Sequence, residues 1–214
     1  MVEPTCAALH ALARNLPRFE FPPPERQVAA NGLYMFFERG ELAHGGDRIV
    51  RVGGHTGHGN LLARLREHVT QNKDRSIFRK NIGRALLAKA RDPFLDDWNR
   101  DLTSHAARAQ YAGRIDMSKQ AKVEEEVTGY ILANLTFCII GTPSADVALA
   151  LEKRCIATVA TCPGCHPSAE WLGSYSPLAG IRESGLWQVQ HLQGEALDAE
   201  SMSELERYAA RGSR

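Results

Sequence analysis

The chain has 214 residues and a formal net charge of +1, with 43% hydrophobic and 24% charged residues. These values are typical of a soluble globular domain, and no apolar run approaches the roughly 20 residues that a membrane-spanning helix needs. The first residues lack a signal-peptide pattern, because His10 and Arg14 interrupt the apolar stretch. We therefore expect a cytoplasmic protein whose five cysteines form no disulfide framework.

Charge is distributed unevenly along the sequence. Residues 48–91 hold eleven Lys or Arg and two acidic residues, which leaves 15 basic and 23 acidic residues elsewhere from totals of 26 and 25. One block is thus near +9 and the rest near −8. Such segregation predicts a basic face for a polyanion, and phosphates are the commonest kind. The alternative is a basic helix surface neutralised by acidic segments packed beside it.

The chain begins with a segment that we interpret as an arm or linker over residues 1–30. Its short helical pattern stops at Pro17, and three successive prolines at 22–24 favour polyproline II. Residues 33–38 (LYMFFE) then read as a buried strand, and 48–53 (RIVRVG) as a second strand with Ile49 leading one side and Arg48 the other. Gly40 and Gly45 mark the turn, so we expect an antiparallel hairpin with a longish loop.

A glycine-rich loop and a helix follow the hairpin. Residues 53–59 (GGHTGHG) contain four glycines and His55, and Asn60 is a candidate N-cap for a helix over 61–70. Arg64 and His68 are four residues apart and share one face of that helix. A helix N-terminus behind a glycine loop favours an anion, so the pattern predicts a phosphate pocket.

The rest of the chain alternates helical and extended patterns. Residues 71–91 predict a loop and a basic helix, and residues 120–131 predict an amphipathic helix. Residues 92–119 between them have a weak pattern and are interpreted as an insertion. Residues 132–140 predict a strand, and Ser144 can cap a helix over 145–160. Glu152 lies at the edge of that helix's apolar stripe, and periodicity alone favours an ordinary surface glutamate. The candidate phosphate contacts in the basic helix and its loop are Arg75, Arg79, Lys80 and Arg84.

The sequence CPGCH at 162–166 matches two metal-related patterns. Covalent haem attachment would require export, which the N-terminus does not predict. Structural zinc needs four ligands, and only Cys162, Cys165, His166 and Cys155 are near in sequence. A loop with reduced cysteines is therefore the default interpretation. The aromatic stretch 171–187 is expected to fold back over the sheet, and residues after 194 predict a terminal helix with a frayed end.

The ordered set of elements resembles the GIY-YIG nuclease domain, especially its restriction-endonuclease-like branch. Gly32-Leu33-Tyr34 resembles the first half-motif and Arg51-Val52-Gly53 the second, although Arg51 stands where the second motif usually has a tyrosine. Residues 64–68 (RLREH) resemble the family helix with an arginine and, four residues on, a histidine. Leu151-Glu152-Lys153 is similar to the segment that presents the metal-binding glutamate. The likeness covers roughly residues 31–160, with 171–187 as an extension.

The resemblance implies an α+β fold with a small, mainly antiparallel three-stranded sheet in the order β-β-α-β-α, flanked by helices. The corresponding division is an arm at 1–30, a nuclease domain at 31–195 with a helical insertion near 92–119, and a tail at 196–214. It further implies hydrolysis of DNA phosphodiester bonds, with duplex DNA and a homodimer suggested by the restriction-like branch.

The resemblance also assigns roles to particular residues. Glu152 would hold one Mg²⁺, for which Mn²⁺ can substitute, and Arg64 would bind the phosphate oxygens. Tyr34 would act as general base or orient the water, assisted by His68 or His55. Arg66 joins the candidate nucleic-acid contacts. Two alternatives stay open: a nucleic-acid-binding module that has lost turnover because of Arg51, and an unrelated α+β protein with zinc at residues 162–166.

Overall fold

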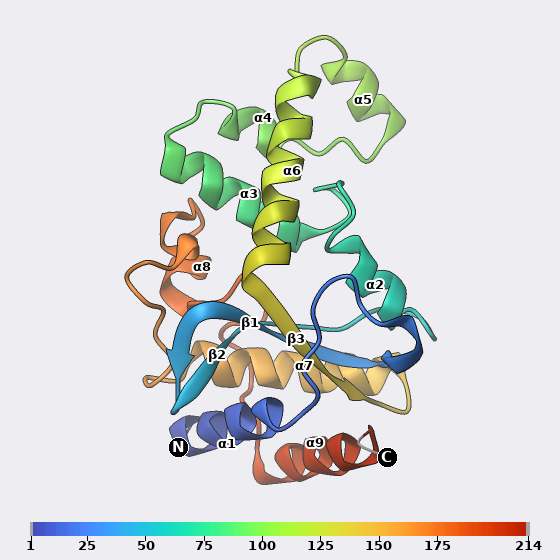
Figure 1. Ribbon diagram of the computed structural model, residues 1–214, viewed down its shortest axis with the longest axis vertical. Helices are drawn as coiled ribbons and strands as arrows, with labels where there is room; N and C mark the ends of the chain where they lie inside the picture. Colours follow the sequence, from blue (N-terminus) through green and yellow to red (C-terminus); the bar gives the residue numbers. More distant parts are fainter. Residues whose placement is uncertain (1, 213–214) are drawn as a thin grey trace.

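Three antiparallel strands form the centre of the molecule, in the order β2-β1-β3 (Figure 1). The coordinates are a computed structural model that describes residues 2–212. Strand β1 spans Gly32–Ala43, β2 spans Gly46–Gly53 and β3 spans Leu135–Gly141. The expected α+β class and the antiparallel three-stranded sheet are confirmed.

Nine α-helices flank the sheet within the described residues. They are α1 (Val2–Arg14), α2 (Leu61–Glu67), α3 (Ile77–Ala90), α4 (Leu95–Asn99), α5 (His105–Tyr111), α6 (Met117–Asn134), α7 (Ala145–Ala160), α8 (Ala179–Ser184) and α9 (Ala199–Gly212). Short 3₁₀ turns occupy Glu25–Gln27 (η1) and Leu172–Tyr175 (η2). None of the helices over residues 2–212 is both long and apolar enough to cross a membrane.

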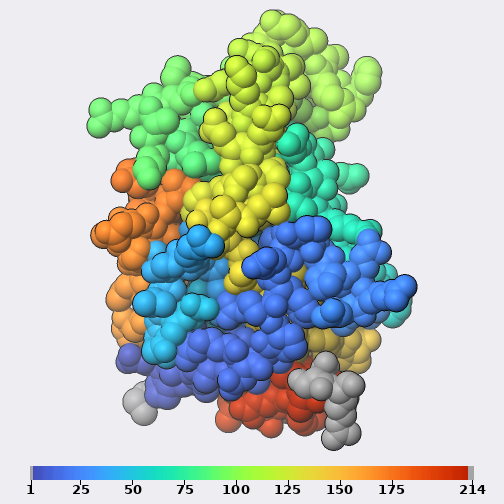
Figure 2. Space-filling view, in the orientation of Figure 1, coloured from blue at the N-terminus to red at the C-terminus, as the bar shows by residue number. Residues whose placement is uncertain are grey.

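The two faces of the sheet bury separate hydrophobic cores, because successive residues of β1 point to opposite sides. Leu33, Met35 and Phe37 pack with α1, α7 and α9. Tyr34 and Phe36 pack on the other side with α2, α3 and α6. Figure 1 shows α1 and α9 below the sheet and α3 and α6 above it. The space-filling view shows the expected arm, in blue, spread over the lower half of this face next to α9, in red (Figure 2).

The hairpin turn is tighter than the sequence predicts. Strand β1 continues through Gly40, whose φ of +86° sits at an irregularity in the β1–β2 register, and ends at Ala43. His44 and Gly45 then make the whole turn with φ values of 50° and 79°. Two successive positive φ values are what a two-residue hairpin of right-handed twist requires. The expected long loop is therefore wrong, since the Gly40 signal marks a strand irregularity.

An extra residue in β2 changes the direction of Arg51. Phe36 pairs with Arg51 and Phe37 pairs with Ile49, so Val50 is inserted between them as a β-bulge. Val50 and Phe36 share the core that contains α2 and α3, whereas Ile49 lies in the opposite core. The bulge brings Arg51 to the side of Phe36, and its guanidinium lies 5.1 Å from the centre of the Phe78 ring on α3.

Most predicted helices form, with shifted boundaries. Helix α7 and its Ser144 cap match the prediction, because the Ser144 hydroxyl accepts from the Val147 amide. Helix α2 ends at Glu67 instead of residue 70, and Asn60 does not cap it, since its amide donates to the Thr56 carbonyl. Residues 132–134, predicted as strand, extend α6, which runs directly into β3. The insertion contains α4 and α5.

The C-terminal extension folds back over the sheet, as predicted. The indole N–H groups of Trp171 and Trp187 donate to one Glu38 oxygen at 3.0 and 2.7 Å, and the Tyr130 hydroxyl donates to the other. The Trp187 amide donates to Val50 of β2 at 2.8 Å, so the extension covers that edge strand. Helix α9 packs beside β3. The predicted frayed end, at residues 213–214, lies outside the described residues.

Candidate active site

The two half-motif strands meet at Tyr34 and Gly53, which lie directly opposite each other in the sheet. A Cβ atom at position 53 would lie 2.3 Å from the Tyr34 hydroxyl oxygen. Only glycine therefore lets the tyrosine ring lie across β2. A glycine is therefore required sterically at the end of the second half-motif. Its missing side chain leaves room for the Tyr34 ring to cross β2, so that the hydroxyl lies beyond the strand.

The Tyr34 hydroxyl meets His68, the residue that follows α2. Its oxygen lies 2.6 Å from Nε2 of His68, and Nδ1 of the same ring lies 2.9 Å from the hydroxyl of Ser76. Ser76 caps α3 by accepting from the Arg79 amide. In the tautomer protonated at Nδ1, Tyr34 donates to His68 and His68 donates to Ser76. This chain links β1, α2 and α3 through side chains that are all fully buried.

Burial keeps the His68 ring neutral. Removal from water lowers the pKa of His68 well below 6.5, and the positive charges of Arg51, Arg64 and Arg79 lower it further. A neutral ring has a free lone pair on Nε2, so it can accept a hydrogen bond or a proton from the Tyr34 hydroxyl.

Arg64 lines an open pocket and also interacts with Tyr34 of the buried pair. Its guanidinium donates to the Glu67 carboxylate at 2.8 Å and to the Arg75 carbonyl at 3.1 Å. Desolvation lowers the pKa of Arg64, but its interactions with Tyr34 and Glu67 outweigh this effect and raise it overall. Arg64 therefore stays charged, next to the tyrosine hydroxyl and on the pocket wall.

The pocket has a volume of about 550 Å³ and collects residues from α2, α7 and the glycine loop. Its lining residues are Gly54, His55, Thr56, Asn60, Ala63, Arg64, Glu67, Leu149, Glu152 and Gln190. A Cβ atom at Gly54 would lie 2.6 Å from a Glu152 carboxylate oxygen. The second glycine of the loop therefore lets α7 bring Glu152 up to the loop backbone.

Glu152 carries a charge that its surroundings do not fully neutralise. Desolvation raises the pKa of Glu152, while Arg51, Arg64, Lys153 and the Gly54 amide oppose that rise without cancelling it. Within residues 2–212, the carboxylate forms no salt bridge. A hydrated divalent cation suits this carboxylate, because Mg²⁺ prefers oxygen ligands, retains several waters and needs the room that the pocket gives.

His55 lines the same pocket and has an unpaired polar atom. Its Nε2 accepts from the Gly32 amide at 3.3 Å, so in the neutral ring the proton sits on Nδ1. Nδ1 is buried and has no hydrogen-bond partner in the described part of the chain. An unsatisfied buried donor costs about 1–3 kcal/mol, so a ligand oxygen that reached Nδ1 would stabilise the site.

Arg51 affects the site through its positive charge but does not line the pocket. It donates to the Trp187 carbonyl at 2.9 Å, and its Nε is buried without a partner among residues 2–212. Its positive charge lowers the pKa values of both His68 and Glu152. Arg51 therefore adds positive potential between the buried pair and the carboxylate.

The structure thus brings Tyr34, Arg64 and His68 together and places Glu152 and His55 on the pocket beside them. Tyr34 and His68 are fully buried and do not themselves line the pocket. Sequence reasoning missed Ser76 and Glu67. A serine before the basic helix carried an N-cap signal, and Glu67 lies three residues after Arg64, which is the spacing of a helical ion pair.

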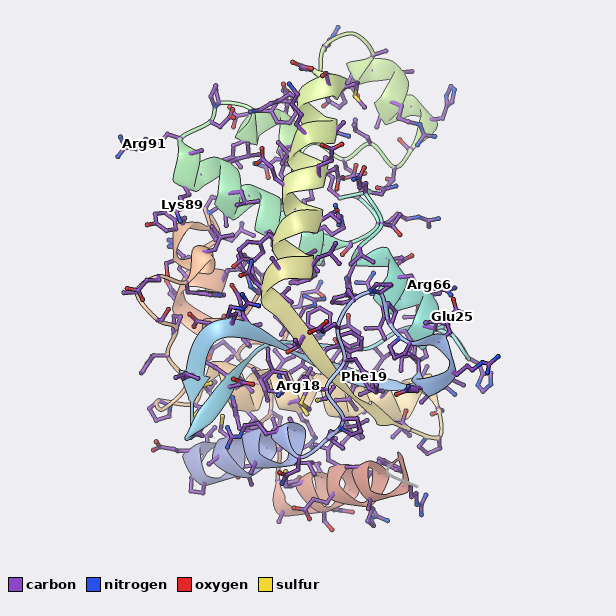
Figure 3. The ribbon with its side chains drawn as sticks, in the orientation of Figure 1. Arg18, Phe19, Glu25, Arg66, Lys89 and Arg91 are labelled. Carbon is purple, nitrogen blue, oxygen red and sulfur yellow. The ribbon has the colours of Figure 1, made fainter. Side chains whose placement is uncertain are left out.

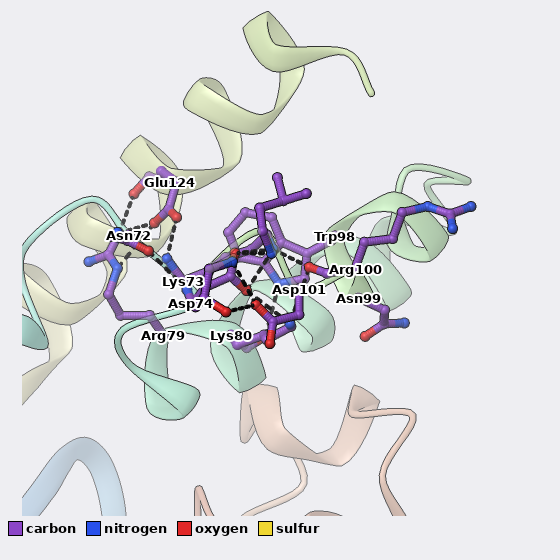
Figure 4. A network of polar contacts seen from close by, with 12 residues as sticks. Asn72, Lys73, Asp74, Arg79, Lys80, Trp98, Asn99, Arg100, Asp101 and Glu124 are labelled. Atoms are coloured by element: carbon purple, nitrogen blue, oxygen red, sulfur yellow. Dashed lines mark hydrogen bonds and ion pairs between the residues drawn. The ribbon is translucent and has the colours of Figure 1, made fainter. Parts of the chain in front are cut away.

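Two of the predicted phosphate contacts must be corrected, because Arg79 and Lys80 are buried. Arg79 is fully buried and its Nη2 donates to Glu124 at 2.6 Å. Lys80 donates to Asp74 at 3.0 Å and to the Arg100 carbonyl at 3.3 Å. Figure 4 shows these side chains in one network between α3, α6 and the loops. Their charges are neutralised inside the protein, so neither remains a candidate for DNA contact.

Only part of the predicted basic face is exposed. Five of the eleven basic residues in 48–91 are buried, namely Arg48, Arg51, Lys73, Arg79 and Lys80. Arg48 pairs with Glu41 at 2.5 Å, and Arg66 pairs with Glu25 on the surface. Figure 3 shows Arg66 and Glu25 on one flank of the molecule and Lys89 and Arg91 on the other.

Three of the predicted nucleic-acid contacts keep solvent access. Arg66 and Arg75 are exposed, and Arg84 is partly exposed while donating to Asn81 and Asn99, each at 2.7 Å. Arg75 follows α2, and its carbonyl accepts from Arg64 of the pocket. Arg75 is therefore the exposed cation tied most directly to the candidate active site.

Comparison with protein families agrees with this arrangement. The family model described as GIY-YIG domain matches residues 11–213. Comparison with curated proteins gave no match, and comparison with solved structures gave none either. The matched residues contain both half-motif strands, the helix with Arg64 and His68, and the helix with Glu152. The chain therefore belongs to the GIY-YIG domain family and has the nuclease-like fold of that family.

Proposed function

We propose that the protein is a metal-dependent endonuclease that hydrolyses phosphodiester bonds of duplex DNA. One observation carries the proposal: Arg64 interacts with the Tyr34 of a buried tyrosine–histidine pair and lines a pocket together with Glu152 and His55. These residues provide an anion-binding guanidinium, a carboxylate ligand and a proton acceptor within one site. Hydrolysis of a phosphate diester needs all three functions.

Glu152 would hold one Mg²⁺, with Mn²⁺ as a substitute. When bound, the ion supplies positive charge for the phosphate oxygens and for the departing 3′ oxygen. Glu152 fits this role because it is a partly desolvated carboxylate on a pocket with space for water ligands. Deprotonation of Glu152 is required for metal binding, so the raised pKa of Glu152 makes affinity fall as the pH is lowered.

Arg64 would bind the non-bridging oxygens of the scissile phosphate. Its planar donor groups suit two oxygens of one phosphate, and the negative charge of Glu67 holds the guanidinium in place before substrate arrives. A phosphate would compete with Glu67 for these donors. The same exchange moves Arg64 away from the Tyr34 hydroxyl and gives that hydroxyl access to the pocket. The Nδ1–H of His55 would donate to a further phosphate oxygen.

Tyr34 would accept the proton of the attacking water. The Tyr34 hydroxyl proton passes to Nε2 of neutral His68 while the Tyr34 oxygen takes a proton from water. The water oxygen forms a bond to phosphorus, and the bond between phosphorus and the 3′ oxygen breaks. The departing 3′ oxygen takes a proton from solvent water, and the products are a 5′-phosphate and a 3′-hydroxyl. His68 is therefore a positioning and proton-holding residue behind Tyr34.

A second candidate function is a DNA-binding module without turnover. Two observations favour it: Arg51 occupies the position of the second motif tyrosine, and Tyr34 is fully buried. Exposed Arg75 and Arg66 would still contact phosphates in such a module. The two candidate functions share a binding surface and differ in cleavage alone.

Cleavage of supercoiled plasmid DNA, with Mg²⁺ and without added divalent ions, separates the two functions. The endonuclease proposal predicts nicked or linear DNA only when Mg²⁺ is present. Direct conversion to linear DNA would indicate coupled cutting of both strands and support the homodimer that the restriction-like resemblance implies. Intact plasmid, together with binding that weakens steeply with salt, would favour the binding module. Absence of both cleavage and binding would overturn the proposal that DNA is the substrate.

A further inference from the structure

Five metal-binding side chains gather on the face of the sheet opposite Tyr34. Cys6 and His10 come from α1, His44 from the hairpin turn, and Cys162 and Cys165 from the loop after α7. One ligand atom from each of Cys6, His10, His44 and Cys165 lies within 4.8 Å of the others. The Cys162 sulfur lies 3.4 Å from Nε2 of His44. Three chain segments that are far apart in the sequence therefore converge on one point.

This spacing suits a tetrahedral zinc ion. Zinc bonds of about 2.0–2.3 Å to nitrogen and sulfur put neighbouring ligand atoms roughly 3.5 Å apart. The Cys162 sulfur lies 3.4 Å from Nε2 of His44, and the Cys6 thiol interacts with the thiols of both Cys165 and Cys162. All of the cysteines are free thiols. Soft thiolates with imidazole select zinc over the oxygen-preferring Mg²⁺.

Hydrogen bonding distinguishes the two histidines. Nδ1 of His10 lies 2.9 Å from the Cys6 carbonyl, and Nε2 of His10 accepts from the Ile49 amide at 3.1 Å. Both ring nitrogens of His10 are thus bound to backbone, as in a neutral buried histidine. Nε2 of His44 faces the Cys162 sulfur instead. His44 is therefore the available imidazole ligand, and His10 is a hydrogen-bonding neighbour.

The surrounding backbone holds His44 against the cysteine loop. Arg14 of α1 donates to the Ala43 and His44 carbonyls at 3.3 and 2.9 Å. His44 adopts a φ of 50°, which is uncommon for a residue with a side chain. A Cβ atom at Gly164 would lie 3.1 Å from Cε1 of His44, so glycine permits this close approach. The Cys165 amide donates to the Cys162 carbonyl at 3.2 Å and closes the loop.

We propose that Cys6, His44, Cys162 and Cys165 bind one structural zinc ion. Four protein ligands leave no open position, which is the arrangement of a structural site. The ion would join α1, the β1–β2 turn and the loop after α7 on the core opposite the candidate active site. The site also corrects the ligand set expected from sequence, because exposed His166 lies outside the cluster and the N-terminal arm provides the missing ligands.

Metal analysis of the full chain tests the proposal. The protein is purified without chelator, dialysed against metal-free buffer and measured for zinc by mass spectrometry. We expect one zinc ion per chain, lost in Cys6→Ser and Cys165→Ser. Cys138→Ser is the matched control, since Cys138 is a buried free cysteine on β3 outside the cluster, and it retains the zinc. Glu152→Gln also retains the zinc, which separates this site from the proposed magnesium site.

X-ray absorption of the wild-type zinc protein keeps the test decisive if a cysteine variant fails to fold. We expect three sulfur ligands and one nitrogen ligand. His44→Gln is expected to lose zinc, whereas His10→Gln is expected to keep it. Wild-type protein without zinc, or with a disulfide between Cys6 and Cys165, would overturn the site. A coordination shell of two sulfurs and two nitrogens, with zinc lost in His10→Gln, would overturn the ligand assignment.

Discussion

The hydroxyl of Tyr34 lies 2.6 Å from Nε2 of His68, and this contact connects the first half-motif strand with the end of α2. Both side chains are fully buried, and Arg64, which lines the open pocket, interacts with Tyr34. The pair is therefore hydrogen-bonded and shielded from solvent. Several expected outcomes depend on this one relationship.

Replacing Tyr34 by phenylalanine removes the hydroxyl and keeps the ring over Gly53. We expect Mg²⁺-dependent cleavage to fall by about 10²–10⁴-fold, the usual contribution of a positioned general base. The unfolding free energy should drop by only about 1–3 kcal/mol, because Nε2 of His68 loses its partner. Cleavage assays and urea denaturation measure the two effects. Tyr208→Phe, which removes a hydroxyl near the surface of α9, should leave cleavage unchanged.

His68 gives the protein a stability that depends on pH. The folded-state pKa of His68 lies well below 6.5, whereas the unfolded chain binds this proton near that value. The unfolded state therefore binds more protons as the pH falls below about 6.5, and stability decreases by up to about 1.4 kcal/mol per pH unit. Denaturation at several pH values between 7 and 5 should show a shallower decrease for His68→Asn. Exposed His105→Asn should keep the wild-type slope.

Glu152 should lower the stability of the metal-free protein. Its folded-state pKa is raised above 4.5, so the unfolded state releases this proton at a lower pH, and the folded state carries the cost of the charge near neutrality. Glu152→Gln should therefore raise the melting temperature at pH 7, by about 2–4 °C for each 1 kcal/mol of relief. Added Mg²⁺ should stabilise the wild type and leave Glu152→Gln unchanged. Equal stabilisation of both would contradict the metal assignment.

Glu124 and Arg79 should matter for stability and not for DNA contact. Glu124→Ala leaves a fully buried guanidinium without its carboxylate, and we expect a loss of about 3–5 kcal/mol by chemical denaturation. Glu125→Ala changes the exposed neighbouring residue on α6 and should have little effect. A loss below 1 kcal/mol for Glu124→Ala would mean that the network in Figure 4 does not stabilise the fold.

Arg75→Ala tests the exposed part of the basic block. Removal of one phosphate contact should weaken binding to duplexes of any sequence and lower the slope of log K against log salt by about 0.9. Folding stability should stay unchanged, because Arg75 is exposed and forms no salt bridge within residues 2–212. An unchanged salt slope would exclude Arg75 from the DNA-binding surface.

The sequence alone predicted those features of the fold and the site whose signals lie within a short stretch of residues. The spacing of Arg64 and His68, the strands around Tyr34 and Gly53, and the capped helix with Glu152 all follow from patterns within a few residues. The bulge at Val50 was not predictable in this way, because one inserted residue reverses the side on which Arg51 lies. Alternation along β2 suggested a regular strand.

Long-range pairing explains the other differences. The basic stripe of α3 suggested a DNA-binding surface, yet Arg79 is neutralised by Glu124, which lies 45 residues later. Sequence analysis of the cysteine loop found too few zinc ligands, because the proposed partners come from distant segments. His44, which contacts Cys162, is 118 residues away from it in the chain. Such pairs depend on how the helices pack, and no window of sequence contains both partners.

The proposed zinc site changes how a metal-removal experiment on the nuclease site should be designed. A strong chelator would act on both metals, since thiolate-bound zinc and carboxylate-bound magnesium are each in exchange with solution. Omission of Mg²⁺ without chelator removes only the weaker ion. Loss of cleavage under that condition, with zinc retained, would assign the requirement to the pocket of Glu152.

The most direct test of the active-site assignment measures DNA binding and DNA cleavage on the same Glu152→Gln sample. Matched duplex DNA, Mg²⁺ and salt are used for wild type, Glu152→Gln and Glu125→Gln. The assignment predicts that Glu152→Gln binds duplex DNA within a few-fold of wild type and does not cleave it, while Glu125→Gln does both. Cleavage by Glu152→Gln at the wild-type rate would show that the catalytic carboxylate lies elsewhere.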